Sequence, residues 1–77
     1  MTKIRVLQIG TGGFGESWLR VVNSYPETEL VAAVDIQQEN LQKAGKIAGL
    51  SEESLFRSID EALEKVSADL ALIVTPP

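Results

Sequence analysis

The feature that most constrains the fold of this sequence is a glycine cluster at residues 10–15. Four of the chain's six glycines fall in this stretch, which reads Gly-Thr-Gly-Gly-Phe-Gly. The order fits the pattern G-x-G-x-x-G. In that pattern the first glycine makes a tight turn, the second lets the backbone approach a pyrophosphate, and the third lets a helix pack closely on a sheet. The cluster therefore predicts a strand before it and a helix after it.

The residues on both sides of the cluster agree with this prediction. Residues 4–10 form an apolar run rich in β-branched side chains, which is typical of a strand buried on both faces. After the cluster, apolar side chains recur at helical spacing until Pro26, which predicts an amphipathic helix of about three turns. We expect Trp18 to pack in the core rather than to serve as a stacking platform. The predicted apolar face of this helix consists of Phe14, Trp18, Val21, Val22 and Tyr25.

Strand-like and helix-like segments continue to alternate along the chain. Short apolar runs predict three more strands, at residues 30–34, 55–56 and 70–74. Between the first two of these runs, residues 41–48 predict a second helix that ends at Gly49. Ser58 and Glu61 have the S-x-x-E form of a capping box and predict a short third helix.

This alternation predicts an α/β fold with right-handed crossovers and a parallel sheet. In a doubly wound sheet the strand order would be 3-2-1-4, with the first two helices on one face and the third on the other. Such an arrangement is a partial Rossmann fold, slightly more than half of the complete one.

Asp35 ends the second predicted strand, twenty residues after Gly15. A dinucleotide-binding fold has an acid at this spacing, and its carboxylate accepts the hydroxyls of the adenosine ribose. The carboxylate would repel a 2′-phosphate, and Ile36 follows it rather than arginine, so we expect NAD rather than NADP. Two other interpretations stay open. One is a glycine turn without a ligand, and the other is an Asp-x-x-Gln cap made by Asp35 and Gln38.

The composition argues against several classes of function. The chain has no cysteine and no histidine, so we expect no disulfide, no thiolate nucleophile and no metal site. Its net charge of −4 disfavours nucleic acid as a partner, although helix N–H groups bind phosphate without cationic side chains. The apolar runs are too short for a bilayer span and the first residues do not resemble a signal peptide. We expect no membrane partner and a cytoplasmic protein.

Three segments together resemble the amino-terminal part of the Gfo/Idh/MocA oxidoreductases. They are the glycine cluster at residues 10–15, the stretch ELVAAVD at residues 29–35, and the stretch DLALIVTPP at residues 69–77. The resemblance covers nearly the whole chain. It implies that residues 1–77 are the first part of a dinucleotide-binding domain, without the rest of that domain and without the carboxy-terminal substrate domain. It also implies a parent enzyme that transfers a hydride between a nicotinamide cofactor and a sugar, cyclitol or related polyol.

The resemblance further implies which residues meet the dinucleotide. The adenosine ribose would lie at Asp35 and Ile36, and the nicotinamide half would lie near Thr75 and Pro76. The family's catalytic lysine belongs to a Glu-Lys-Pro motif beyond this sequence, so we expect the 77 residues alone to be inactive and to hold no catalytic residue. The remaining cofactor-binding residues would be Gly10, Thr11, Gly12, Gly13, Phe14 and Gly15.

Two other functions use similar residues. Methyltransferases also have a glycine turn after a first strand, but they usually carry an acid two residues before the first glycine, where this chain has Gln8. A nucleotide-sensing or interaction module without catalysis would need the same residues as the enzyme.

The fourth predicted strand, at residues 70–74, would form an uncovered apolar edge. The sheet face that carries only the third helix would also lack cover. We therefore expect the chain to self-associate through this edge or this face.

Overall fold

Strand β1 (Ile4–Ile9) lies between β2 (Thr28–Val34) and β4 (Leu70–Ile73), and β3 (Leu55–Phe56) lies beyond β2. All neighbouring strands are parallel. The structure is a computed structural model that describes residues 3–74. Its strand order, β3-β2-β1-β4, confirms the order predicted from the sequence.

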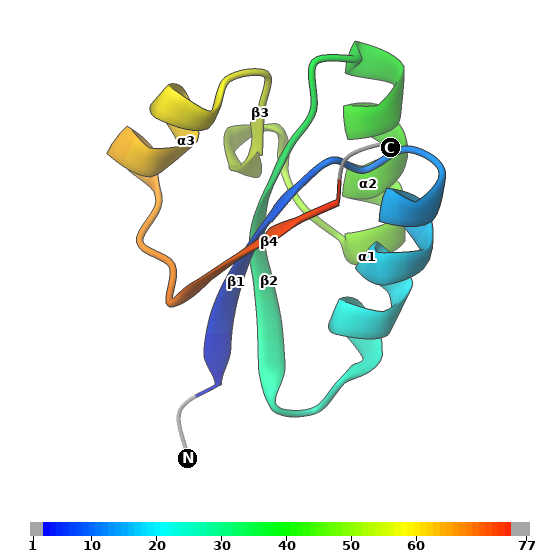
Figure 1. Cartoon of the computed structure of the whole chain (residues 1–77), viewed down its shortest axis with the longest axis vertical. Helices are drawn as coiled ribbons and strands as arrows, with labels where there is room; N and C mark the ends of the chain where they lie inside the picture. Colours follow the sequence, from blue (N-terminus) through cyan, green and yellow to red (C-terminus); the bar gives the residue numbers. More distant parts are fainter. Residues whose placement is uncertain (1–2, 75–77) are drawn as a thin grey trace.

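In the described part of the chain, three helices connect the strands and cover both faces of the sheet. Helix α1 (Phe14–Ser24) joins β1 to β2, and α2 (Gln38–Ala48) leads to β3 through the 3-10 turn η1 (Glu52–Ser54). Helix α3 (Ile59–Lys65) joins β3 to β4. Helices α1 and α2 lie together on one side of the sheet and α3 lies on the other (Figure 1). The fold is therefore α/β and of the partial Rossmann type that the sequence predicts.

Successive residues of β1 supply two separate cores, because neighbouring side chains of a strand point to opposite faces. Val6 packs with Leu19 of α1 and Leu41 of α2. Leu7 packs on the other face, with Phe56 of β3 and with α3. The central strand thus holds both helical layers, and its carboxyl end lies where the glycine cluster begins.

The predicted buried face of α1 is wrong, because only Val22 among its five residues is buried. Trp18, which was expected in the core, is 46% exposed. The helix instead buries Gly15, Leu19 and Val22 against the sheet. The apolar residues Phe14, Trp18, Val21 and Tyr25 form an exposed stripe along α1.

The ends of the other helices agree with the sequence. Gly49 closes α2 in the left-handed conformation, and its N–H donates to the Gly45 carbonyl. The Ser58 hydroxyl accepts a hydrogen bond of 3.4 Å from the Glu61 N–H and so caps α3. Within residues 3–74, no helix is long and apolar enough to cross a membrane.

Candidate functional site

The glycine cluster forms the loop that links the end of β1 to the start of α1. Gly10 has a φ of 94°, a conformation that favours glycine, and its N–H donates to the Val34 carbonyl at 2.8 Å. A side chain at Gly15 would overlap the carbonyl group of Gly10. The tight turn at Gly10 and the close packing of helix on sheet at Gly15 both match the reasons for which the pattern needs glycine.

The first turn of α1 leaves three adjacent N–H groups without a hydrogen-bond acceptor among the described residues. They belong to Gly12, Gly13 and Phe14. The next two are used inside the turn, since Gly15 donates to the Gly12 carbonyl and Glu16 donates to the Gly13 carbonyl. No side chain caps the helix at Gly13, its N-cap residue. Free N–H groups at the positive end of a helix dipole attract an anion.

Asp35 follows β2 directly and is bonded to the glycine loop. Its Oδ2 accepts hydrogen bonds from the Thr11 N–H at 2.8 Å and from the Thr11 hydroxyl at 3.1 Å. Its Oδ1 accepts from the Gln37 N–H at 2.8 Å, and the Asn40 amide lies 3.4 Å from both oxygens. The N-cap of α2 is Gln37, without a side-chain cap bond, so the alternative cap by Asp35 and Gln38 does not form.

These contacts set the ionisation of Asp35. Partial burial raises the pKa of the Asp35 carboxyl group, but hydrogen bonds from Gln37, Thr11 and Asn40 outweigh this effect and lower it below its ordinary value. The side chain is therefore an anion at neutral pH. It offers acceptors to hydroxyl groups and repels phosphate.

One cavity of about 500 Å³ brings most of the predicted site residues together. Phe14 and Ile36 are 78% and 73% exposed, so their side chains are free to contact a ligand at its rim. Thr11 does not line the cavity, because it is buried and its hydroxyl is bonded to Asp35. Thr75 and Pro76 lie outside the described residues. The lining residues are Gly10, Gly12, Gly13, Phe14, Gly15, Asp35, Ile36, Gln37, Asn40 and Val74.

Asn40 is a site residue that the sequence interpretation missed. It lies in the first turn of α2, where its amide contacts Asp35, and its Nδ2 would be 2.6 Å from a Cβ placed on Gly12. No spacing rule points to an asparagine at this position. Its role follows only from the packing of α2 beside the loop.

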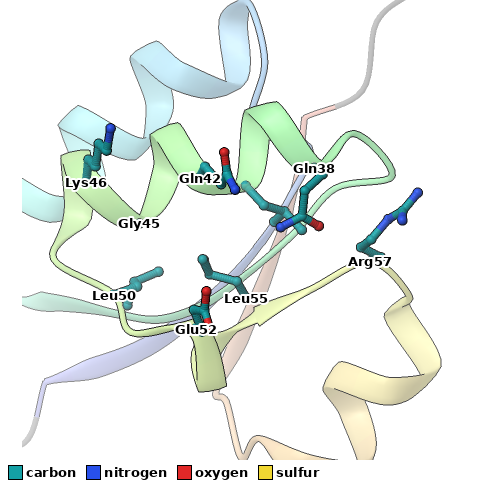
Figure 2. A pocket seen from close by; sticks show the side chains of 9 residues that line it. Gln38, Gln42, Gly45, Lys46, Leu50, Glu52, Leu55 and Arg57 are labelled. Carbon is teal, nitrogen blue, oxygen red and sulfur yellow. The ribbon is translucent and has the colours of Figure 1, made fainter.

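A larger hollow of about 710 Å³ lies on another part of the molecule, between α2 and the segment that holds η1 and β3 (Figure 2). Leu50 and Leu55 lie at its base, while Gln38, Gln42 and Lys46 of α2 line its other side. None of the predicted ligand-binding residues that the structure describes lines this hollow. We therefore assign the candidate site to the smaller cavity, where unpaired N–H groups and an anionic carboxylate meet.

Comparisons with known proteins agree with the fold and identify the family. A family model described as "Oxidoreductase family, NAD-binding Rossmann fold", that of Gfo/Idh/MocA, matches residues 4–77. The uncharacterized protein y4oX of Sinorhizobium fredii is 40% identical over 77 residues, which are 95% of this chain and 21% of that protein.

Solved structures of dehydrogenases are similar over almost the whole chain. The scyllo-inositol dehydrogenase of Lactobacillus casei, with bound NAD(H) and scyllo-inositol, superposes with a TM-score of 0.86 at 24% identity, over 97% of this chain and 22% of that one. The myo-inositol 2-dehydrogenase of Lactobacillus plantarum gives 0.84 at 26% identity, over 97% and 22% of the two chains. The WlbA dehydrogenase of Bordetella pertussis, in complex with NADH and UDP-GlcNAcA, gives 0.82 at 28% identity, over 96% and 22%.

The chain thus spans about a fifth of the length of the relatives it matches. Within that span the strand order and the family match agree. The chain belongs to the Gfo/Idh/MocA oxidoreductase family, whose family model is that of an NAD-binding Rossmann fold.

Proposed function

We propose that this chain is the NAD-binding portion of an oxidoreductase and forms the first part of a dinucleotide-binding domain. The observation that carries the proposal is the pairing of two features in one cavity. Three free N–H groups at the start of α1 are suited to a pyrophosphate, and the anionic Asp35 is suited to ribose hydroxyls. The NADH named in the complex of the WlbA dehydrogenase supports the same cofactor.

The positions of these residues determine how a dinucleotide would be oriented in the cavity. The pyrophosphate would accept hydrogen bonds from the N–H groups of Gly12, Gly13 and Phe14. The adenosine ribose would donate to Asp35 in place of the Asn40 amide, the most distant of its present partners at 3.4 Å. A second cavity of about 530 Å³ begins at Asp35 and Ile36 and has room for the adenine ring.

The substrate class is part of the proposal. Inositol dehydrogenases and a dehydrogenase complexed with a nucleotide sugar are among the similar structures, which favours a sugar, cyclitol or related polyol. NAD, when bound, supplies the hydride acceptor for such a substrate. This chain's own residues bind and orient the cofactor, and we propose that residues 1–77 alone do not catalyse the reaction. A cytoplasmic location stays a prediction.

The experiment that tests this function is a binding titration of the 77-residue chain with NAD and with NADP. We expect NAD to bind more tightly, because a 2′-phosphate would meet the Asp35 carboxylate. We expect Asp35→Ala to weaken NAD binding. Unchanged NAD affinity in that variant, or a preference of the wild type for NADP, would contradict the proposal.

A nucleotide-sensing module would pass the same titration, so a second measurement separates it from an enzyme. Assaying NADH formation with inositol by the full-length protein that contains residues 1–77 would do so. Hydride transfer by that protein supports the enzyme. NAD binding without any turnover supports the sensor.

We also propose that the chain self-associates. Leu70 and Ile73 of β4 are 51% and 65% exposed, and Leu63 on the face of α3 is 62% exposed. A second copy of the chain would cover such apolar surface.

A further inference from the structure

Gln8 is a fully buried polar residue in the middle of β1. It is 0% exposed, and its neighbours in the strand, Leu7 and Ile9, are both core residues. Its side chain points to the same face of the sheet as Val6, toward the layer of α1. An amide in this position needs partners, because burying a polar group without hydrogen bonds is unfavourable.

The Gln8 amide links the two ends of the glycine loop. Its Nε2 donates to the Gly15 carbonyl at 2.7 Å and to the Gly10 carbonyl at 2.9 Å. Gly10 begins the loop and Gly15 lies in the first turn of α1. Both partners are acceptors, so both hydrogens of the amide are used to hold them together.

The peptide group between Gly10 and Thr11 is thereby held at both of its ends. Its carbonyl accepts from Gln8, and its N–H donates to the Asp35 carboxylate at 2.8 Å. Among the described residues, Gln8 is the sole donor to the Gly10 carbonyl. Since Gly10 lacks a Cβ and has a positive φ, this peptide would otherwise rotate with little resistance. The loop residues that follow it carry the free N–H groups.

The oxygen of the Gln8 amide, unlike its nitrogen, does not help to hold the loop. Its Oε1 is buried and has no donor among the described residues. A buried acceptor without a partner destabilises a fold. A leucine or methionine of similar size would remove this acceptor, but it would also leave the Gly10 carbonyl without its donor. The amide is thus distinguished from an apolar side chain by the bonds that join the two ends of the loop.

We propose that Gln8 is a positioning residue, which fixes the glycine loop in the shape where the N–H groups of Gly12, Gly13 and Phe14 converge on one pyrophosphate. The inference rests on the proposed function, since it assumes that the loop binds a dinucleotide. It extends that function to a residue which does not line the cavity. A loop that is already in its binding shape loses less entropy when the ligand binds.

A series of ligands tests this role. Dissociation constants for adenosine, ADP and NAD are measured by titration of the wild type, Gln8→Leu and Gln8→Met. We expect ADP and NAD to bind about tenfold more weakly to both variants, while adenosine changes less than about twofold. As a control, Leu30→Val shortens a core side chain of β2 that is remote from the loop, and it should leave the ratio between ADP and adenosine unchanged.

A merely structural role would give a different pattern. It predicts that Gln8→Leu weakens all three ligands by the same factor. Our inference expects a selective loss for ADP and NAD, whatever the change in unfolding temperature, because Gln8→Leu removes the donor to the Gly10 carbonyl as well as the unpaired Oε1. Wild-type affinity for NAD in Gln8→Leu, or a uniform loss for all ligands, would overturn it.

In the variant Gln8→Glu, the proposed hydrogen bonds to the loop should depend on pH, and so should the affinity for ADP. An ionised glutamate would place acceptors against the carbonyl groups of Gly10 and Gly15, whereas a protonated one has an O–H to donate to one of them. ADP binding by Gln8→Glu should therefore strengthen as the pH falls from 8 to 5, with the wild type changing far less. A flat profile for Gln8→Glu would contradict the proposed hydrogen bonds.

One measurement is independent of ligand binding. If the wild type bound neither ADP nor NAD, the proposed function would fail, but the role of Gln8 in shaping the loop would still be decided by NMR. Backbone order parameters at Gly12 and Gly13 should fall in Gln8→Leu from the value of about 0.85 of a rigid backbone, while those of β2 stay the same. Unchanged order parameters in the loop would reject the role.

Discussion

At the scale of single residues, Asp35 couples the stability of the fold to the candidate site. Its carboxylate is the acceptor for the N–H groups of Thr11 and Gln37. Because Thr11 is buried, Asp35→Ala would leave its N–H and hydroxyl without this partner. We expect the free energy of unfolding to fall by about 1–3 kcal/mol, measured by urea denaturation. A variant as stable as the wild type would show that these hydrogen bonds add nothing to the fold.

The same carboxylate predicts a pH dependence. The pKa of Asp35 is lowered in the folded chain, so its ionised form stabilises the fold above its ordinary pKa of about 4. This contribution is lost as the pH falls through the lower pKa of the folded state. The difference in unfolding free energy between the wild type and Asp35→Asn should therefore shrink between pH 5 and pH 2. A difference that stays constant over this range would contradict the assignment.

Gly15 and Gly12 form a matched pair of loop positions. A Cβ at Gly15 would overlap backbone atoms of Gly10, whereas a Cβ at Gly12 would meet the end of the flexible Asn40 side chain. We expect Gly15→Ala to lower the free energy of unfolding by about 1–3 kcal/mol, and Gly12→Ala to lower it by less. Thermal or urea unfolding of both variants compares the two sites. Equal losses would show that the close approach of helix and sheet is not the constraint.

The meeting of the glycine loop and Asp35 was predictable from the sequence, because the G-x-G-x-x-G pattern and an acid about twenty residues later follow a spacing typical of dinucleotide-binding folds. Gln8 and Asn40 were not. Gln8 interrupts an apolar strand, and only the folded loop reveals which carbonyl groups its amide reaches. Asn40 reaches Asp35 because α2 folds back beside the loop. Contacts of this kind depend on tertiary packing and leave no periodic pattern in the sequence.

At the scale of elements, the order of helices and strands was predictable and the orientation of α1 was not. Apolar residues occur on two sides of this helix, and the side with more aromatic residues was the natural choice for the core. The structure buries the other side, because Gly15 lets α1 approach the sheet and Leu19 then fills the space beneath it. The identity of the buried side therefore depends on the loop as much as on the apolar pattern.

Adjacent residues of α1 test this orientation. Leu19 is fully buried, whereas Trp18 is about half exposed. We expect Leu19→Ala to lower the free energy of unfolding by about 2–5 kcal/mol and Trp18→Gln to change it by less than about 1 kcal/mol. Urea unfolding followed by circular dichroism measures both without relying on the tryptophan signal. A larger loss for Trp18→Gln would restore the orientation predicted from the sequence.

At the scale of the whole molecule, the exposed apolar surface is not evenly spread. The stripe of α1 lies on the side away from α2, because Asn23, on the opposite flank, donates to the Ile47 carbonyl of α2. Beyond β1 in the same direction, β4 is the edge of the sheet, and Leu70 and Ile73 are exposed there. Exposed apolar side chains therefore lie along the fourth strand and the outer flank of α1, in addition to those of Ile36 and Leu63.

This arrangement favours one mode of self-association over others. Among the described strands, β4 pairs with β1 alone, so its other side offers backbone groups to a second β4. Two copies related by a twofold axis would pair these edges antiparallel and cover Ile73 in both.

We expect sedimentation equilibrium to show a dimer whose population grows with concentration. Ile73→Lys should shift the chain to monomer, because a charged residue on an edge strand opposes pairing. The matched substitution Leu63→Lys, on the face of α3, should leave the dimer intact. If Leu63→Lys were monomeric and Ile73→Lys dimeric, the interface would lie on the face of α3 instead of the strand edge. A wild type that stays monomeric at high concentration would reject association altogether.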